Sequence, residues 1–464
     1  MSFVPHYDIS FDGNWFLRIM VPPIVFEAAL SIDKRSFNRH IVPITLFAVV
    51  GTLLATVITA YIVHRGTVSL GLHCETIPFV ESLTFGALIS SIDPIAVLSV
   101  LGNMGMTDTD TIYVLIFGES LLNDGVAIVL FQTLVHFLDD SLVIDSEAIV
   151  SGTIHFFVVA AGSLVVGIGS GFACTGYYYI MQGCQTPLVE VLLFFCWAFI
   201  PYYVCDGIGW SGIVAVVATG VVMDLYVVGQ DVDEAVTITE IRSDSGKPGR
   251  RGIFSGYGHL SDVAKTHVGF VTEILATMME TAIFAYLGVF LFSSRYHWNF
   301  WHALLAIVAC CISRAIMIPT LAFAANWITR AQQLRQNCRQ PARRAGNNNG
   351  VIIDTKMQLV LWVAGLRGAM SFALVEHIPL YDEITGEGTR LKAEMKAMTS
   401  ATIVFTVFVL GGYTFYMMEQ LGLAPNKKAA STSETVSLLN QARKSTSEDS
   451  FKVSDKTVRQ RPKS

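Results

Sequence analysis

Long apolar runs recur along almost the whole chain, and they limit its possible folds more than any other feature. A hydrocarbon core about 30 Å thick requires about 20 apolar residues per helix, and about eleven runs approach that length. Lipid offers no partner to backbone polar groups, so every run is expected to be helical. The expected spans are residues 15–30, 41–63, 78–102, 111–138, 152–180, 187–204, 209–228, 267–293, 299–328, 356–380 and 397–421. The sequence therefore predicts an all-α polytopic membrane protein.

Composition supports this fold class and excludes others. Of the 464 residues, 52% are hydrophobic and 15% are charged, whereas soluble domains average about 25% charged residues. The chain is too apolar for intrinsic disorder and too long for a small disulfide scaffold. Its expected surroundings are the lipid bilayer, and no nucleic-acid partner is expected.

The distribution of basic residues predicts the orientation of the spans. Lys and Arg gather around residues 34–39, 242–251 and 330–344, and these three loops lie on one side if the spans alternate. Acidic residues gather in loops of the opposite side, around 139–147 and 382–387. Because cytoplasmic loops carry the excess of Lys and Arg, we expect a cytoplasmic C-terminus and an extracytoplasmic N-terminus.

Three polar segments flank or interrupt the spans. Residues 1–14 are expected to form an extracytoplasmic stub ahead of a transmembrane domain over 15–424. Residues 229–264 are rich in Asp, Gly and Arg without periodicity, and are expected to be a cytoplasmic loop insertion. The Ser-, Lys- and Glu-rich residues 425–464 are expected to be a disordered cytoplasmic tail.

Ionisable side chains also occur inside the predicted spans. Each costs about 2.5–3.5 kcal/mol at the centre of a membrane helix, so each is a functional candidate. They concentrate in four spans, and the set is Asp93, Glu119, Asp124, Arg314 and Arg367. Asp224 and Glu376 lie near span ends, where we expect them to reach water.

Helical geometry separates the roles of these charges. Glu119 and Asn123 are four residues apart and share a helix face, with Asp124 about 100° further round. Glu119 needs a cation, and only Arg314 and Arg367 are central enough to supply one. We expect a structural Glu119–Arg314 pair, which leaves Asp124 without a basic partner.

A carboxylate at that depth suits exchange of a cation for a proton. Desolvation disfavours its charged form and a bound cation favours it, so one site can hold either species. Pro94, and the glycines Gly365 and Gly368, interrupt two spans, and interrupted helices at corresponding places point to a transporter site. Freed carbonyls with Asp, Asn and Ser oxygens suit Na⁺ or K⁺ rather than zinc or copper.

Each feature also has a simpler interpretation. Pro94 could be a plain kink, and Asp124 could be a satisfied buried acid. Glu27 and Glu280 could line a cavity or act as contacts between helices. Among other functions, a passive channel would need a filter such as TVGYG or a ring of acids, and a membrane hydrolase a motif such as HExxH or GxSxG; the sequence contains none of these short motifs. A transport-inactive scaffold stays open as an alternative.

Several motifs, in order and spacing, resemble the sodium/proton exchangers of the monovalent cation:proton antiporter-1 family. The most specific pair is FGESLLND (117–124) followed by GLRGAMSFAL (365–374). The others are VPPIVFEAAL (21–30), FAVVGT (47–52), SSIDPIAVLSVL (90–101), ETAIFAYLGV (280–289), ISRAI (312–316) and FTVFVLGG (405–412). The resemblance runs from about residue 18 to residue 422.

The resemblance implies an inverted-repeat cation/proton antiporter fold with two unwound crossing helices. Such a fold has a core domain and a dimerisation domain, moves in an elevator-type cycle and works as a homodimer. It also implies a secondary transporter, not an enzyme, that exchanges Na⁺ or K⁺ for H⁺ and regulates pH without a cofactor. The membrane would be the plasma membrane or an endomembrane such as the endosome, Golgi or vacuole.

The resemblance also assigns residue roles. Asp124 would bind the proton or the metal ion, Na⁺ or K⁺, together with Asp93, and Ser120 would lie close to the ion. Asn123 would partner Asp124 in the pair that marks electroneutral exchangers. The implied structural pair is Glu119 with Arg314, and the implied second crossing helix carries Gly365, Arg367 and Gly368.

The chain departs from the family pattern in three places. Members usually have about two further helices ahead of the PP motif, and we expect the chain to lack them. Those helices belong mainly to the dimer interface. The loop 229–264 resembles an insertion, and the tail is shorter than in hormone-regulated members.

Overall fold

The computed structural model describes most of the predicted membrane part of the chain. The described residues are 16–69, 71, 75–106, 110–138, 146–181, 185–229, 258–290, 297–339, 352–381 and 388–422. Over these residues the fold is helical, and the one β-bridge joins Leu380 to Thr389. The predicted stub 1–14 and tail 425–464 lie outside the described residues.

Each predicted span contains helix in the structure. The first half of the chain contains η1 (Phe16–Met20), α2 (Val21–Ser31), α3 (Lys34–Arg39), α4 (Ile41–Thr45), η2 (Leu46–Gly51), α5 (Thr52–Ser69), α6 (Phe79–Ser90), α7 (Ile95–Asn103), α8 (Thr111–Val135), η3 (His136–Leu138), α9 (Ser146–Met181), α10 (Pro187–Gly207), α11 (Gly212–Met223) and η4 (Asp224–Val228). The second half contains α13 (Asp262–Phe290), α14 (Phe300–Arg339), α15 (Thr355–Val363), α16 (Ala369–His377), α17 (Lys392–Phe405), η5 (Thr406–Gly411) and α18 (Gly412–Gln420). Seven continuous segments of the described chain are long and apolar enough to cross a membrane by themselves.

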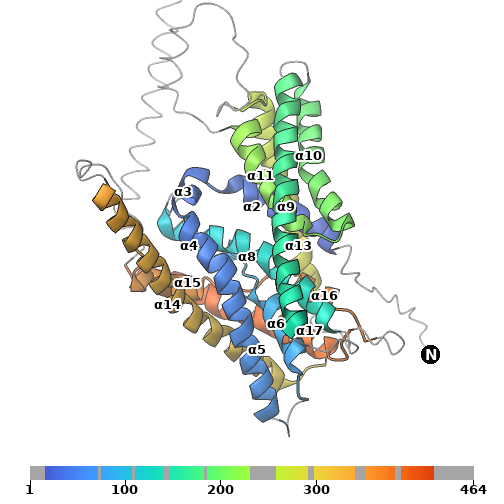
Figure 1. The fold of residues 1–464 in the computed structure, drawn as a ribbon, viewed down its shortest axis with the longest axis vertical. Helices are drawn as coiled ribbons and strands as arrows, with labels where there is room; N and C mark the ends of the chain where they lie inside the picture. Colours follow the sequence, from blue (N-terminus) through green and yellow to red (C-terminus); the bar gives the residue numbers. More distant parts are fainter. Residues whose placement is uncertain are drawn as a thin grey trace, which may run out of the picture.

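The helices pack as two bundles that meet along α8 (Figure 1). The first bundle contains α5, α6, α8, α14, α15, α16 and α17, and the second contains α2, α9, α10, α11 and α13. Small residues allow the closest approaches inside each bundle. A Cβ on Gly86 would overlap the Thr56 backbone between α5 and α6, and a Cβ on Gly167 would overlap the Ala215 carbonyl between α9 and α11.

Two spans of the first bundle are broken in the middle. Residues 91–94 separate α6 from α7, and residues 364–368 separate α15 from α16. Pro94 cannot donate a backbone hydrogen bond, and the glycines of the second break tolerate close contacts. The two breaks touch, since the Asp93 amide donates to the Leu366 carbonyl at 2.9 Å. Each broken span is the middle one of three consecutive spans, over 41–138 and 300–420, which is the order that an inverted repeat requires.

The structure corrects the predicted extent of the loop 229–264. Helix α13 begins at Asp262, five residues earlier than the predicted span, and the residues before it are tied to the second bundle. The Ser261 amide and hydroxyl both donate to the Glu190 carboxylate, at 3.1 and 2.7 Å, and the His259 amide donates to the Val227 carbonyl at 2.8 Å. These contacts depend on tertiary packing, which local composition does not encode.

The prediction that Glu376 reaches water at its span end is wrong, whereas Asp224 keeps some exposure but is paired as well. Asp224 forms an ion pair with Lys34 at 2.8 Å, and Glu376 forms one with Lys396 at 2.6 Å. Lys34 is buried and the other three side chains are at most one-fifth exposed. Each lysine sits close enough in space to neutralise a carboxylate that the sequence places far away.

Candidate functional site

A cavity of about 90 Å³ lies where the broken helices face the second bundle. Four carboxylate side chains line it: Asp93 and Asp124 from the first bundle, and Glu27 and Glu280 from α2 and α13 of the second. The rest of the wall is mainly apolar, which keeps the local polarity low. The four acids belong to four different predicted spans, and the fold brings them together at one cavity.

Asp124 lies in α8 and faces this cavity. The Ser91 hydroxyl, at the first break, donates to its Oδ1 at 2.7 Å. Within the described part of the chain, no Lys, Arg or His forms an ion pair with it. Asp124 is therefore a carboxylate inside the candidate membrane span Thr111–Leu138, with a serine hydroxyl rather than a basic side chain as its described partner.

Asp93 occupies the first break itself, directly ahead of α7. Its Oδ1 accepts from the Ile95 amide at 3.1 Å, so the carboxylate lies at the positive end of this short helix. Gly368, at the start of α16, packs against the same carboxylate, because a Cβ there would overlap Asp93. The second break thus needs glycine where it passes the acid of the first break.

Asn123 uses both ends of its amide to hold the first break in place. Its Nδ2 donates to the Ser90 carbonyl at 2.9 Å, and its Oδ1 accepts from the Thr52 hydroxyl at 2.6 Å. Asn123 is buried and does not line the cavity. In this conformation it therefore positions the backbone beside Asp124.

Ser120 lies one helical turn before Asp124 and lines the cavity. Its hydroxyl donates to the Ile92 carbonyl at 2.7 Å. Hydroxyl and carbonyl oxygens thus stand next to the carboxylates in the cavity wall, and oxygen donors of this kind suit hard cations such as Na⁺.

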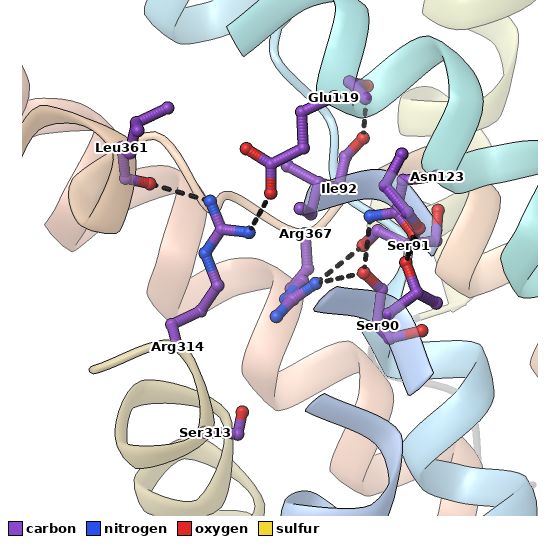
Figure 2. Close-up of polar contacts among 12 residues, drawn as sticks. Ser90, Ser91, Ile92, Glu119, Asn123, Ser313, Arg314, Leu361 and Arg367 are labelled. Atoms are coloured by element: carbon purple, nitrogen blue, oxygen red, sulfur yellow. Dashed lines mark hydrogen bonds and ion pairs between the residues drawn. The ribbon is translucent and has the colours of Figure 1, made fainter. Parts of the chain in front are cut away.

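Glu119 and Arg314 form an ion pair at 2.7 Å, and both side chains are about 3% exposed (Figure 2). The second arm of the guanidinium donates to the Leu361 carbonyl at 2.7 Å, near the carboxyl end of α15. Gly365 allows this approach, because a Cβ there would overlap the Arg314 side chain. Glu119 is consequently neutralised inside the first bundle, away from the cavity lining.

Arg367 lies in the second break and reaches the carboxyl end of α6 (Figure 2). Its NH1 donates to the Ser90 and Ser91 carbonyls at 2.7 and 3.0 Å, and its Nε donates to Cys310 Sγ at 3.2 Å. The last carbonyls of a helix have no partner inside it and carry a partial negative charge. Arg367 compensates that charge at α6.

Several polar residues of the site were not among the sequence candidates. They are Thr52, Ser91, Cys310 and Thr406, whose hydroxyl accepts from the Arg367 amide at 3.1 Å. Thr52 directly follows the π-helical segment η2, and Thr406 is the first residue of the π-helical segment η5. Such segments often mark functional sites. Thr52, Ser91 and Thr406 could have been found from the sequence, because they lie inside the family-like motifs FAVVGT, SSIDP and FTVFVLGG.

The same described ranges do not contain a cluster of metal-binding side chains. No three His, Cys, Asp or Glu side chains converge there, so the described residues lack a closed structural metal site. The four carboxylates of the cavity wall are therefore not arranged as a closed metal cluster in the described residues.

Comparison with known proteins agrees with this geometry. The family described as "Sodium/hydrogen exchanger, transmembrane" matches residues 8–420. Sodium/hydrogen exchanger 5 of Arabidopsis thaliana is 30% identical over 431 residues, which are 92% of this chain and 71% of the relative. Sodium/hydrogen exchanger 8 of Homo sapiens is 26% identical over 440 residues, 93% of this chain and 65% of the relative.

A solved structure shares the fold. That of the sodium proton antiporter MjNhaP1 from Methanocaldococcus jannaschii aligns with a TM-score of 0.59 at 15% identity, over 89% of this chain and 85% of that one. The chain spans between 44% and 71% of the length of eight of the curated exchangers that it matches. Family match, sequence identity and fold agree: this chain belongs to the sodium/hydrogen exchanger family.

Proposed function

We propose that the chain is a secondary antiporter that exchanges Na⁺ or K⁺ for H⁺ at Asp124. The observation that carries this proposal is the pair of carboxylates, Asp93 and Asp124, that line one cavity without a basic partner in the described residues. Family membership supports the same function, since the matched relatives are sodium/hydrogen exchangers.

Competition at one carboxylate gives the exchange its coupling. When protonated, Asp124 is neutral and stable in the low-polarity cavity. When it binds a cation, the Ser91 hydroxyl at 2.7 Å and the oxygens of Ser120 and Asp93 in the cavity wall would help replace the ion's water. Proton and cation therefore exclude one another, because desolvation penalises an uncompensated carboxylate.

Electroneutral exchange follows if one proton is exchanged for one monovalent cation. Glu119 does not add a titrating charge, since Arg314 neutralises it at 2.7 Å. Asn123 carries no charge, so Asp124 is the one acid of the two neighbouring positions. This assignment predicts that transport moves no net charge across the membrane.

Alternating access would come from movement of one bundle against the other. The cavity has walls from both bundles, with Asp93 and Asp124 on one side and Glu27 and Glu280 on the other. A shift of the first bundle along the second would carry the ion between the two faces, as in an elevator. A homodimer would hold the second bundle still during that shift.

The proposed setting is an integral multi-pass protein of the plasma membrane or an endomembrane, with a cytoplasmic C-terminus. The basic loops support that orientation. In either membrane the exchange would regulate the pH and the cation content of the compartment.

The proposal is tested with the purified full chain in proteoliposomes that contain a pH-sensitive dye. We expect Na⁺ or K⁺ gradients to drive proton movement, and Asp124→Asn to abolish it while the protein still inserts. The matched control is Asp262→Asn, which alters an exposed acid at the start of α13. Full exchange by Asp124→Asn would refute the assignment of Asp124.

A membrane-potential dye in the same vesicles distinguishes the alternatives. A passive cation channel would generate a potential and dissipate either gradient without coupling. An inactive scaffold would show neither proton movement nor a potential. Coupled proton movement without a potential is the result that we expect.

A further inference from the structure

A second cavity, of about 230 Å³, is lined by residues of α8, η3, α9 and α10. Three histidines and one acid contribute to its wall: His136, His155, His377 and Asp206. Trp210, in the connection before α11, also lines it. None of these residues belongs to the cavity of Asp124, and the proposed exchange does not use them.

His136 and His155 both line this cavity and form an edge-to-face ring pair. Their ring centroids are 6.4 Å apart and the ring planes are nearly perpendicular, at 89°. Both residues are exposed, and the interaction described for each ring is with the other. Within the described part of the chain, the two imidazoles therefore stand together without a hydrogen bond to a carboxylate or carbonyl.

The pair joins the two bundles. His136 belongs to η3, which continues α8 of the first bundle, whereas His155 belongs to α9 of the second. Asp206 is in α10, also of the second bundle, and its present partner is Arg18 at 2.9 Å. That ion pair is largely exposed, with the two side chains 57% and 33% accessible, so little free energy opposes its opening.

We propose that His136 and His155 bind a transition-metal dication of the zinc class. Neutral imidazole is the most common metal ligand and suits Zn²⁺, Ni²⁺ and Cu²⁺. A metal held by one nitrogen of each ring at about 2.1 Å in tetrahedral geometry places the ring centroids roughly 5 Å apart. The observed centroid separation of 6.4 Å is longer, so the two exposed side chains would have to move toward one another when the metal binds.

The remaining positions on the metal are open. In the described residues no three metal-binding side chains converge in this conformation. The cavity has room for water on the metal, and Asp206 can join if it leaves Arg18. A site with two fixed ligands and water binds reversibly rather than as a structural zinc site, in which four protein ligands close the coordination sphere.

A metal at this position would act as a clamp between the bundles. It would join α8 to α9 and so oppose the relative movement that the elevator cycle requires. The binding site itself stands on geometry alone, while the inhibition rests on the proposed antiport function. By the predicted orientation the cavity faces the extracytoplasmic side, so the metal would come from that side.

Binding is tested on the purified full chain in detergent, by titration with ZnCl₂ followed by calorimetry. We expect a site that loses affinity by about tenfold or more in His136→Ala and in His155→Ala, since even outer-shell losses cost 10–100-fold. His267→Ala is the matched control, because it removes an exposed histidine elsewhere, on α13. Equal zinc affinity in the wild type and in the His136→Ala/His155→Ala double variant would overturn the proposal.

Transport is measured in proteoliposomes with ZnCl₂ on both sides. We expect zinc to inhibit exchange by the wild type and by His267→Ala, and to lose that effect in the double variant. Zinc binding without inhibition would support the binding site but refute its role in opposing the movement of the bundles. Absence of exchange without zinc would refute the antiport function, while the calorimetric result would still decide the metal site.

Discussion

The Arg367 guanidinium donates to the Ser90 carbonyl at 2.7 Å, at the carboxyl end of the half-helix α6. Arg314 makes the equivalent contact with Leu361 in the other broken span, also at 2.7 Å. Both half-helices thus end on a buried arginine, which balances the partial negative charge of their last carbonyls. Asp93, in contrast, lies at the amino end of α7, where that partial charge is positive.

Replacement of Arg367 tests this pattern directly. Arg367→Gln leaves the two carbonyls of α6 without a charged donor, and the loss of such hydrogen bonds costs about 3 kcal/mol in a buried site. We expect lower thermal stability in detergent and strongly reduced exchange in proteoliposomes. Arg367→Lys keeps the charge but not the fork of donors, so we expect an intermediate loss.

The control for that prediction is Arg390→Gln. Arg390 is exposed and lies over the Tyr381 ring at 4.4 Å, outside both breaks. We expect its removal to change stability and exchange little. If Arg367→Gln behaved like Arg390→Gln, compensation of the α6 carbonyls would not be its role.

The Glu119–Arg314 pair predicts a stability effect that is not additive. Glu119→Gln leaves the Arg314 charge buried and unpaired, which costs about 3–5 kcal/mol. The double variant Glu119→Gln/Arg314→Met removes both charges, so we expect it to lose less stability than the sum of the two single variants. Melting of the purified proteins in one detergent measures all four members of the cycle. Strict additivity would contradict a direct interaction.

Much of this architecture is visible in the sequence, because the lipid imposes it. Each predicted span contains helix, and Pro94 and the Gly365–Gly368 segment marked the two interruptions. Buried acids are rare inside membrane spans, so Asp93 and Asp124 stood out by residue type alone. These signals are local and need no knowledge of neighbouring helices.

The rest depends on contacts between distant segments. Thr52 is one of many threonines inside apolar spans, and only packing of α5 against α8 brings it to Asn123. Asp224 was expected to reach water because its partner, Lys34, is 190 positions earlier in the chain. The start of α13 at Asp262 likewise depends on its anchoring near Glu190. No period or composition in the sequence encodes such pairings.

Gly368 offers a test of how closely the two breaks must approach. A Cβ at this position would overlap the Asp93 carboxylate, so Gly368→Ala must displace either the acid or the start of α16. We expect exchange to fall by at least about tenfold, because small misplacement of reacting groups is costly, while most of the fold persists. Gly288→Ala, where nothing lies within 4 Å of the added methyl, should retain exchange. Equal activities of the two variants would show that the contact is dispensable.

Thr52 is expected to act through Asn123 rather than on the ion. Its hydroxyl fixes the amide oxygen of Asn123, so that the amide nitrogen points at the Ser90 carbonyl beside Asp124. Thr52→Val removes that donor without changing side-chain volume much, and we expect slower exchange with a shifted apparent affinity for Na⁺. Thr52→Ser keeps the hydroxyl and should restore most of the rate.

Thr320→Val is the matched control, since the exposed Thr320 hydroxyl bonds only within its own helix. Initial rates in proteoliposomes over a Na⁺ series measure both parameters. If Thr52→Ser were as slow as Thr52→Val, the hydrogen bond to Asn123 would not explain the effect.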